Sequence, residues 1–413
     1  MYTLKRFLGD DFKYFNSIID KYNLEQNTYI NLTACVSYPF QEVLDVQAMP
    51  LATIPTEGTR GKRYFPNVES IEDIEDYAEE LGLYLFGIKN SGYKISVQPN
   101  SGTQANQIVY NAILNNGDTV LALNPKDGGH ISHTKLGCRD IRPIYFSLDI
   151  NLDIDYDLLE LLIIKEHPKL VIVGASSYIK EFDYKKIYSI TSRYKIPLMA
   201  DICHSVLYII GNVHKKIFPY VDFATFTMDK LLCGPQGGVI IYKEKYNSKI
   251  VTSIFPKTQG GPIQNGLFAK TMCFLKLCSM NVHEYAETVI NNTNLMIDTL
   301  KSKNIATINE IAHNHIILVD MTSNNIFGRD AEKLLFENGV IVNRNQIPND
   351  KQSALISSGI RIGTVPITNL NYSKDDIVQL GKYLADIING DCTTKDVFSF
   401  LIEKYHKNIN ISS

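Results

Sequence analysis

The stretch FATFTMDKLLCGPQGGVIIY, residues 223–242, places a lysine between two β-prone runs. The first run, 223–228, ends in Asp229 and Lys230, and a Gly-Pro-Gln-Gly-Gly turn leads into the second run, 239–242. The connection is too short for the helical crossover that joins parallel strands, so the second run is expected to return antiparallel to the first. The pattern predicts a lysine held rigidly at the mouth of a sheet, a placement that suits covalent chemistry.

Further β-prone runs indicate the fold class. They cover residues 118–124, 169–175, 196–201, 222–228 and 238–242. The middle three are separated by about one βαβ unit, and the segment 184–195 between two of them has a helical pattern. The sequence therefore predicts an α/β fold in which a mainly parallel sheet is covered by helices.

The length of the chain and a change of pattern predict two domains. A chain of 413 residues exceeds what one small core accommodates. A long helical pattern at 283–304 is followed by β-prone runs at 315–321, 340–345 and 359–364 and by helical patterns at 328–339 and from 374 onward. We predict an N-terminal arm over 1–25, a large α/β domain over 26–285 and a smaller α+β domain over 286–413.

The composition argues against several classes of partner. A formal net charge of −3 gives no reason to expect nucleic acid or an acidic membrane surface. The seven cysteines are scattered and form no C-x-x-C pair, which favours a reduced, cytoplasmic chain without a metal site. The N-terminus has no apolar core of signal-peptide length, and the apolar run 158–164 is too short to span a bilayer.

Polar residues follow several of the predicted strands. Ser101, Gly102 and Thr103 precede a helical pattern whose N-terminal N–H groups would bind a phosphate. Asp201 ends one strand and Lys230 follows the next. The other polar residues at strand ends are Ser176, His204 and Thr227. Ligands bind at the carboxyl ends of strands in open α/β sheets, so the set predicts a pyridoxal 5′-phosphate site. Asp201 would pair with the ring nitrogen, and Lys230 would condense with the aldehyde.

Eight motifs, in one order over most of the chain, resemble those of the serine hydroxymethyltransferase family. They are INLTACVSYP (30–39), TEGTRGKRYFPNVESIEDIE (56–75), QPNSGTQAN (98–106), DGGHISH (127–133), DKLLCGPQGG (229–238), FPKTQGGP (255–262), VNRNQIPND (342–350) and SSGIRIGT (357–364). The resemblance implies a fold-type I pyridoxal-phosphate transferase whose large domain holds a mainly parallel, seven-stranded sheet. It also implies a homodimer with shared active sites, an amino acid substrate and tetrahydrofolate as co-substrate.

The resemblance assigns roles to individual residues. Lys230 would be the Schiff-base lysine, and Asp201 the partner of the ring nitrogen. Glu57 would be the acid–base group at the substrate side chain, and Arg361 would bind the substrate carboxylate through its planar fork. His204, a further catalytic residue, would lie near the ring hydroxyl. Further cofactor contacts are implied for Ser101, Gly102, Thr103, Asp127, Ser176, Thr227, Gly260 and Gly261. Further substrate contacts are implied for Cys35, Tyr64 and Phe65. In the implied dimer, Glu57, Tyr64, Gly260 and Gly261 would reach the neighbour's cofactor.

The sequence also departs from the family pattern at seven positions. Asp127 stands where the family has the histidine that stacks on the pyridine ring, and Asp229 replaces the histidine before the lysine. Cys35 replaces a serine, Val36 a glutamate, Pro55 a tyrosine, Phe65 a second tyrosine and Gln236 an arginine. These positions surround the ring face and the substrate rim, whereas the cofactor anchors are kept. The division indicates retained cofactor chemistry with an altered substrate or acceptor, and it puts the use of tetrahydrofolate in question.

Simpler structural roles are alternatives for some of these residues. Asp201 could cap a helix, Arg361 could form a structural ion pair, and Glu57 could be a turn carboxylate. The acidic run 69–80 is expected to be a solvated helix face. Buried positions without a role in the chemistry are the expectation for Cys35 and Cys203 and an alternative for His130 and His133.

The predicted function is that of an enzyme that makes or breaks the Cα–Cβ bond of a β-hydroxy amino acid. Hydroxymethyl transfer between serine and glycine is the family default, and a folate-independent aldolase or transaldolase that uses another aldehyde is the alternative. A third possibility keeps the cofactor but changes the bond, as in decarboxylation, racemisation or transamination. The alternative of another class is a non-catalytic homologue that binds the cofactor, and the retention of Lys230, Asp201 and Arg361 argues against it.

Overall fold

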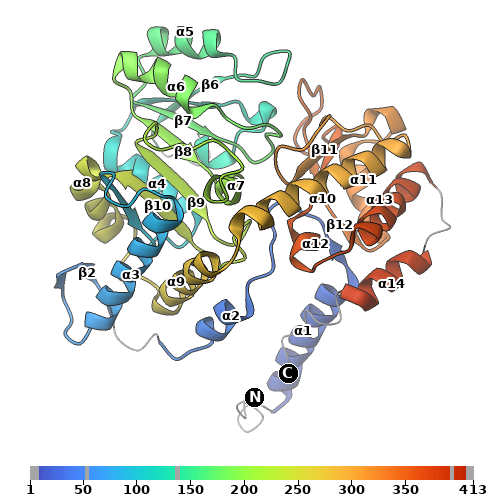
Figure 1. Cartoon of the computed structure of the whole chain (residues 1–413), viewed down its shortest axis with the longest axis horizontal. Coiled ribbons are helices and arrows are strands. Elements are labelled where there is room, and N and C mark those ends of the chain that lie inside the picture. The colour runs from blue at the N-terminus through green and yellow to red at the C-terminus, as the bar shows by residue number, and fades with distance from the viewer. Residues whose placement is uncertain (1–8, 52–54, 135–139, 391–394, 406–413) are drawn as a thin grey trace. The chain divides into compact units, whose positions relative to one another are not determined.

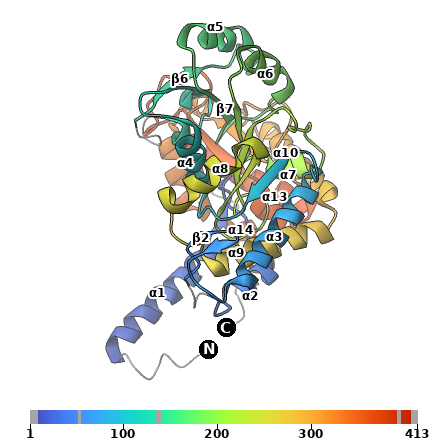
Figure 2. The same ribbon diagram turned by 90° about the vertical axis from the view of Figure 1, so that its left-hand side faces the viewer.

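The computed structural model describes residues 9–51, 55–134, 140–390 and 395–405 (Figures 1 and 2). The chain divides into two compact units, Cys35–Ile290 and a second unit made of Met1–Ala34 and Asn291–Ser413. The domain boundaries given by the sequence pattern remain predictions.

A seven-stranded sheet forms the centre of the unit Cys35–Ile290. Its order is β4 (Tyr93–Ser96), β10 (Gly238–Lys243), β9 (Phe223–Thr227), β8 (Leu198–Asp201), β7 (Leu170–Gly174), β5 (Thr119–Leu123) and β6 (Arg142–Phe146). The strands from β9 to β6 are parallel, and β10 is antiparallel to both of its neighbours. The predicted antiparallel return after Lys230 is therefore confirmed, and so is the mainly parallel sheet. Strands β5, β7, β8 and β9 are buried along their whole length, which explains their continuous apolar sequences.

The helices of this unit are α2 (Gln41–Gln47), α3 (Glu69–Leu85), α4 (Gly102–Ile113), α5 (Tyr156–Glu166), α6 (Tyr184–Thr191), α7 (Val206–Ile210), α8 (Asn247–Thr252) and α9 (Gln264–Ser279). Helix α10 (Val282–Ser302) begins in this unit and contains the boundary between the units. Helix α4 packs on β9, β10 and α8, α5 packs on β5 and β6, and α3 packs on β4 and α9 (Figures 1 and 2). Side-chain oxygens of Ser101, Asp155 and Asp183 accept N–H bonds that cap α4, α5 and α6.

The second unit contains a smaller antiparallel sheet. Its elements are α1 (Gly9–Thr28), β1 (Ile30–Asn31), β11 (Ile316–Asp320), α11 (Gly328–Glu337), β12 (Val340–Ile341), β13 (Asn343–Asn345), β14 (Gly359–Gly363), α12 (Val365–Asn369), α13 (Lys374–Asn389) and α14 (Lys395–Tyr405). The sheet has the order β11-β14-β13, and β1 pairs separately and in parallel with β12. In neither unit do the described residues include a helix with the length and apolar character needed to cross a membrane.

Gly174 allows two neighbouring strands of the large sheet to approach closely. It ends β7 and pairs in register with Asp201, the last residue of β8. A Cβ atom at position 174 would lie 2.3 Å from the carbonyl oxygen of Asp201 and 2.6 Å from its Cβ. Because both contacts are to atoms fixed by the backbone, any side chain here would move the strand end that carries Asp201.

We predict that Gly174→Ala destabilises the protein through this overpacking. The free energy of unfolding should fall by about 1–3 kcal/mol, measured as a shift of the urea midpoint of the cofactor-free protein. The matched control is Gly266→Ala in α9, where the nearest atoms to a new Cβ would lie at 3.6 Å. Alanine is favoured over glycine in a helix by about 1 kcal/mol, so this control should be neutral or stabilising. Equal midpoints for the two variants would contradict the predicted overpacking.

Candidate active site

The polar strand ends meet at one edge of the large sheet. Asp201 on β8 pairs in register with Thr225 on the neighbouring β9. The N-terminus of α4 lies at the same edge, because a Cβ atom on Gly102 would lie 3.3 Å from Cys203 Sγ and 3.5 Å from Thr227 Cβ. The first N–H groups of an α-helix lack intrahelical acceptors, so this edge offers a seat for an anion beside the two strand ends.

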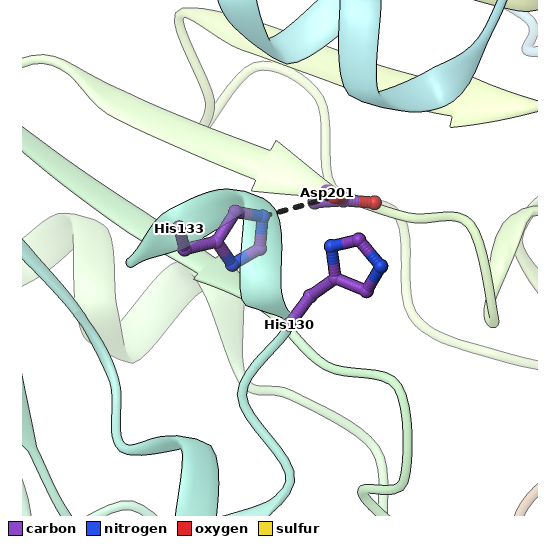
Figure 3. Close-up of side chains that lie close together, drawn as sticks. All are labelled: His130, His133 and Asp201. Atoms are coloured by element: carbon purple, nitrogen blue, oxygen red, sulfur yellow. Dashed lines mark hydrogen bonds and ion pairs between the residues drawn. The ribbon is translucent and has the colours of Figure 1, made fainter. Parts of the chain in front are cut away.

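Asp201 is held by hydrogen bonds from three different segments. Its Oδ2 lies 2.9 Å from His133 Nε2 (Figure 3). The same oxygen lies 2.8 Å from Asn106 Nδ2, and Oδ1 accepts from Cys203 N at 3.2 Å. Burial raises the pKa of the Asp201 carboxyl, but the hydrogen bond and charge of His133, the charge of His130 and the Asn106 amide outweigh burial and leave it well below its usual range. The carboxylate is therefore ionised at neutral pH.

The hydrogen bonds continue beyond Asp201. Thr225 Oγ1 donates to Asn106 Oδ1 at 2.5 Å, and Asn106 Nδ2 also donates to Ser132 Oγ at 3.0 Å. Ser132 Oγ lies 2.7 Å from His130 Nδ1. Because an ionised carboxylate can only accept, the proton between His133 and Asp201 belongs to His133 Nε2. Asp201 is thus oriented by a network that reaches from α4 to the segment 130–133.

Two kinds of ligand could bind near this network. The ligand atoms of His130, His133 and Asp201 all lie within 4.8 Å of one another, so the three could hold a metal ion. The hydrogen bonds favour the other arrangement, in which Asp201 stays paired with protein donors. A carboxylate has about four lone-pair sites, and three are used here, which leaves one for a protonated ring nitrogen.

Lys230 lies at the same edge on a tightly bonded turn. Its Nζ is 3.2 Å from His204 Nε2. Gly234 N donates to Met228 O at 3.0 Å and Met228 N to Gly237 O at 3.2 Å, which closes the turn from both sides. Thr227 Oγ1 donates to Gly237 O at 3.0 Å and also bonds the carboxylate of Asp229.

The segment after Cys35 packs on this turn. Ser37 Oγ donates to Asp229 O at 2.8 Å, and Phe40 N donates to Cys233 O at 2.9 Å. Cys35 itself is exposed, so the expectation that it is a buried small side chain was wrong, whereas Cys203 is buried as expected. Cys35 is accessible from solvent, and its contact with the substrate remains a prediction.

Ser176 and Asp127 lie beyond the carboxyl ends of β7 and β5. The N–H and the hydroxyl of Ser176 both donate to Gly128 O, at 2.8 and 3.2 Å. Asp127 Oδ2 accepts from Leu148 N at 3.2 Å. The carboxylate that replaces the family's stacking histidine is thus bonded to the backbone that follows β6.

Glu57 belongs to a second cluster, on the hairpin of β2 (Gly58–Thr59) and β3 (Lys62–Arg63). A Cβ atom on Gly260 would lie 3.2 Å from Glu57 Oε1, and one on Gly261 would lie 3.1 Å from Glu57 N. Tyr64 N donates to Glu57 O at 3.0 Å, and the Tyr64 ring meets the Phe255 ring edge-on, with centroids 5.6 Å apart. Within the described residues no hydrogen bond or ion pair joins Glu57 to Lys230.

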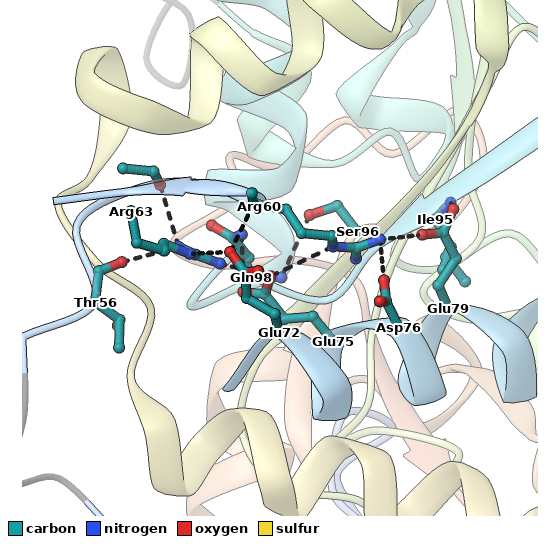
Figure 4. A network of polar contacts seen from close by, with 12 residues as sticks. Thr56, Arg60, Arg63, Glu72, Glu75, Asp76, Glu79, Ile95, Ser96 and Gln98 are labelled. Atoms are coloured by element: carbon teal, nitrogen blue, oxygen red, sulfur yellow. Dashed lines mark hydrogen bonds and ion pairs between the residues drawn. The ribbon is translucent and has the colours of Figure 1, made fainter. Parts of the chain in front are cut away.

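A buried ion pair anchors this hairpin to α3. Arg63 donates to the carbonyl oxygens of Thr56 and Gly58 at 2.8 and 3.1 Å and to Glu75 Oε2 at 2.6 Å (Figure 4). The side chains of Arg63 and Glu75 are each 2% exposed. The sequence pattern predicts that the run 69–80 is a solvated helix face. That prediction is wrong for Glu75, because this acid is buried against an arginine from the hairpin.

Aromatic and polar residues complete the surroundings of Glu57. Phe65 is 38% exposed and Tyr64 70% exposed, so both rings are available to a ligand or partner. A cavity of about 520 Å³ lies beside the hairpin and is lined by residues that include Arg60, Lys62, Glu79, Lys94, Tyr242 and Phe255. Neither Lys230 nor Asp201 lines it, so this cavity and the cofactor anchors are different sites of the same unit.

Arg361 lies in the other unit. It is buried in β14, and its Nε donates to Asn343 Oδ1 at 3.1 Å on the neighbouring β13. Asp350 in the same unit accepts from the N–H and the hydroxyl of Ser358 at 2.8 and 2.7 Å. The motifs around 342–350 and 357–364 thus meet in one small sheet.

Comparison with known proteins identifies the family. A family model described as serine hydroxymethyltransferase matches residues 10–384. The chain belongs to the serine hydroxymethyltransferase family. It is similar to serine hydroxymethyltransferase 1 of Cupriavidus pinatubonensis, with 33% identity over 374 residues that cover 90% of this chain and 89% of the relative. Serine hydroxymethyltransferases of Cupriavidus necator and Ralstonia pickettii match with the same identity and coverage.

Membership of the serine hydroxymethyltransferase family confirms several sequence predictions. The protein is a fold-type I, pyridoxal-phosphate-dependent transferase of amino acid metabolism, and tetrahydrofolate is the family's known co-substrate. The strand-end residues fit pyridoxal phosphate: an ionised carboxylate, an amine and a helix N-terminus converge at one sheet edge. The roles of individual residues remain predictions.

Sequence reasoning missed two members of this site. Asn106 lies within the motif 98–106, whose resemblance implies no role for it, although its amide bonds Asp201, Thr225 and Ser132. A polar residue on the buried face of a helix, among Ala105 and Ile108, was the available signal. His133 is fully buried, as one of the alternatives for it predicts, and its Nε2 also donates to Asp201.

We predict that borohydride reduction of the holoenzyme fixes the pyridoxyl group on Lys230. Lys230→Ala should fold, still bind the cofactor without a covalent link, and lose the adduct, because its amine is the one at the strand edge beside His204. Lys216→Ala, which removes an exposed lysine, is the control and should keep the adduct. Peptide mass spectrometry that finds the pyridoxyl group on another lysine would refute the assignment.

Proposed function

We propose that this enzyme makes or breaks the Cα–Cβ bond of a β-hydroxy amino acid, and that its preferred aldehyde is not the one-carbon unit carried by tetrahydrofolate. The observation that carries the proposal is a contrast between two parts of the unit Cys35–Ile290. Asp201 is held by donors from Asn106, His133 and Cys203, and Lys230 lies at the same sheet edge beside His204. The hairpin that carries Glu57 lacks phenol groups at Pro55 and Phe65, where the family has tyrosines.

Pyridoxal phosphate, when bound, supplies an electron sink for the charge left on Cα when a bond to that atom breaks. Asp201 supports this chemistry because an ionised carboxylate holds a proton on the ring nitrogen. Asn106 and His133 keep the carboxylate oriented. Lys230 supplies the amine that binds the aldehyde, and His204 at 3.2 Å can exchange a proton with that amine.

Two further residues would act on the substrate. Glu57 would hold or remove a proton at the hydroxyl on Cβ, which is the step that frees the aldehyde. Its backbone is fixed by Arg63, Tyr64 and the close approach of Gly261. Arg361 would bind the substrate carboxylate and so select which bond to Cα lies perpendicular to the ring.

The residues that differ from the family pattern, Pro55, Phe65 and Asp127, support the use of a different aldehyde. A phenol can donate a hydrogen bond or a proton, and a phenyl or pyrrolidine ring in its place cannot. Loss of general acid–base help costs typically about 10²–10⁴-fold in rate. Asp127 accepts a hydrogen bond from Leu148 N, and a carboxylate cannot stack on an aromatic ring as an imidazole does. Serine–glycine transfer with tetrahydrofolate is the second candidate, since Glu57, Tyr64 and Asp350 are retained.

We also propose that the active enzyme is a homodimer in which Glu57, Tyr64, Gly260 and Gly261 serve the partner's cofactor. The exposed position of Tyr64 supports this arrangement. A second support is the apolar surface of α1, where Tyr14, Phe15, Ile18, Ile19 and Tyr22 are exposed. The free thiols of the described cysteines fit a reducing, cytoplasmic location.

Arg361→Ala should weaken the binding of amino acids and leave the affinity for pyridoxal phosphate nearly unchanged. Loss of a charge-assisted, bidentate pair in a buried site costs about 2–5 kcal/mol. Spectral titration with glycine, serine and threonine measures the effect. The control is Arg344→Ala, which removes an arginine of the neighbouring strand β13 that pairs with Glu332 of α11 at 3.0 Å. Unchanged amino acid affinity in Arg361→Ala would remove Arg361 from the site.

The choice of aldehyde is tested by steady-state kinetics on a panel of substrates. We expect kcat/KM for retro-aldol cleavage of threonine or a larger β-hydroxy amino acid to exceed that for serine with tetrahydrofolate. Phe65→Tyr is the matched variant, and it should raise the folate-dependent rate because it restores a phenol. Serine with tetrahydrofolate as clearly the best pair would overturn the proposal in favour of the second candidate.

A further inference from the structure

Lys270 is a buried cation that lies outside the cofactor anchors. It belongs to α9, and the residue is 4% exposed. Its Nζ donates to the carbonyl oxygens of Val97 and Pro99, both at 2.6 Å, and of Gly238 at 3.3 Å. Among the described residues no carboxylate forms an ion pair with Lys270, which is unusual for a buried lysine because the charged group loses its hydration. Its three carbonyl acceptors indicate a specific structural purpose.

The acceptors favour the charged form of Lys270. An ammonium group has three N–H donors and the site has three carbonyl oxygens, whereas a neutral amine would leave one acceptor facing its lone pair. Burial lowers the pKa of Lys270 to about 7, and the negative charge of Asp229 opposes this shift. Asp229, which stands where the family has a histidine, thus places a compensating charge near the buried ammonium.

The three carbonyl groups belong to the two segments that frame the cofactor. Val97 and Pro99 lie between β4 and the N-terminus of α4, and Gly238 is the first residue of β10 after the Lys230 turn. Pro99 O also accepts from Gly238 N at 2.9 Å. A Cβ atom on Gly238 would lie 2.2 Å from Ser101 O, so the two segments touch at the residue that caps α4.

The aliphatic part of Lys270 packs against the Lys230 turn. A Cβ atom on Gly237 would lie 2.1 Å from Lys270 Cε, so the absence of a side chain at 237 makes room for the lysine. The carbonyl oxygen of Gly237 accepts from Thr227 Oγ1 and from Met228 N. One side chain therefore contacts both the segment that begins the phosphate-binding helix and the turn that carries the reactive lysine.

We propose that Lys270 is a positioning residue that sets the distance between the phosphate seat, at Ser101 to Thr103, and the amine of Lys230. It does not touch the cofactor; it acts through the carbonyl groups of Val97, Pro99 and Gly238. The aldehyde and the phosphate-bearing arm of the cofactor are attached to neighbouring carbons of one ring, so this short covalent link limits how far apart their two seats can lie if both groups are to bind. The inference rests on the family's dependence on pyridoxal phosphate and on no particular amino acid substrate.

The test compares two probes, pyridoxal 5′-phosphate and pyridoxal, which has the aldehyde and lacks the phosphate. Both are titrated by absorbance into the cofactor-free full-length protein. In Lys270→Met the phosphate seat is no longer fixed relative to Lys230, so pyridoxal phosphate affinity should fall by about tenfold to a hundredfold. Pyridoxal does not use the phosphate seat, so its affinity should fall by less than about threefold. Lys276→Met, at a more exposed lysine of the same helix that pairs with Glu42, is the matched control.

A second variant keeps the proposal testable if Lys270→Met does not fold. Gly237→Ala would push on the flexible stem of Lys270 and leave its charge in place. The ratio of the affinity for pyridoxal phosphate to the affinity for pyridoxal should therefore fall, but by a smaller factor than in Lys270→Met. A purely stabilising role would lower the thermal midpoint and leave the ratio of the two affinities unchanged. That result, or equal losses for both probes, would overturn the proposal. No amino acid is used, so the outcome does not depend on the proposed reaction.

Discussion

The burial of one negative charge organises the functional edge of the large sheet. Transfer of a carboxylate into a protein interior costs several kcal/mol unless donors replace its water. Asp201 meets that requirement with an amide from α4, an imidazole from the segment after β5 and a backbone N–H from its own strand end. Each donor must be held in place, so three elements distant in sequence are fixed at one point. The same carboxylate is thereby kept ionised and aimed.

A buried positive charge, that of Lys270 on α9, has the complementary effect elsewhere in the same unit. Lys270 fixes the carbonyl groups on both sides of Gln98, and the Gln98 side chain donates to Glu75 at 3.0 Å. Glu75 pairs with Arg63, which in turn bonds the backbone around Glu57. The short segment 97–99 is therefore shared by the edge that carries Asp201 and Lys230 and by the hairpin next to Glu57. Its backbone bonds Lys270, and the side chain of Gln98 belongs to the network of Glu75 and Arg63 (Figure 4).

The fold was more predictable from the sequence than the contacts of the site. Buried parallel strands have continuous apolar sequences, and the length of the connection after Lys230 decides the direction of β10, so local information was sufficient there. Strand β6 contains Pro143 and is only partly buried, and its pattern gave no signal. The burial of Glu75, the exposure of Cys35 and the role of Asn106 depend on partners far away in the sequence. A single sequence carries no direct trace of such partners, and the family resemblance supplied residue roles without their hydrogen bonds.

The antiparallel direction of β10 has a consequence for how this enzyme can change over evolution. The chain leaves the functional edge at Thr227 and returns to it at Gly238, so both ends of the turn are fixed by the register of β9 and β10. One residue more or less would shift that register, place a side chain where only Gly238 fits against Ser101 O, and turn every following residue of β10 to the opposite face. Most surface loops accept insertions and deletions. This one can vary in composition, as Gln236 and Asp229 illustrate, but its length is set by the sheet.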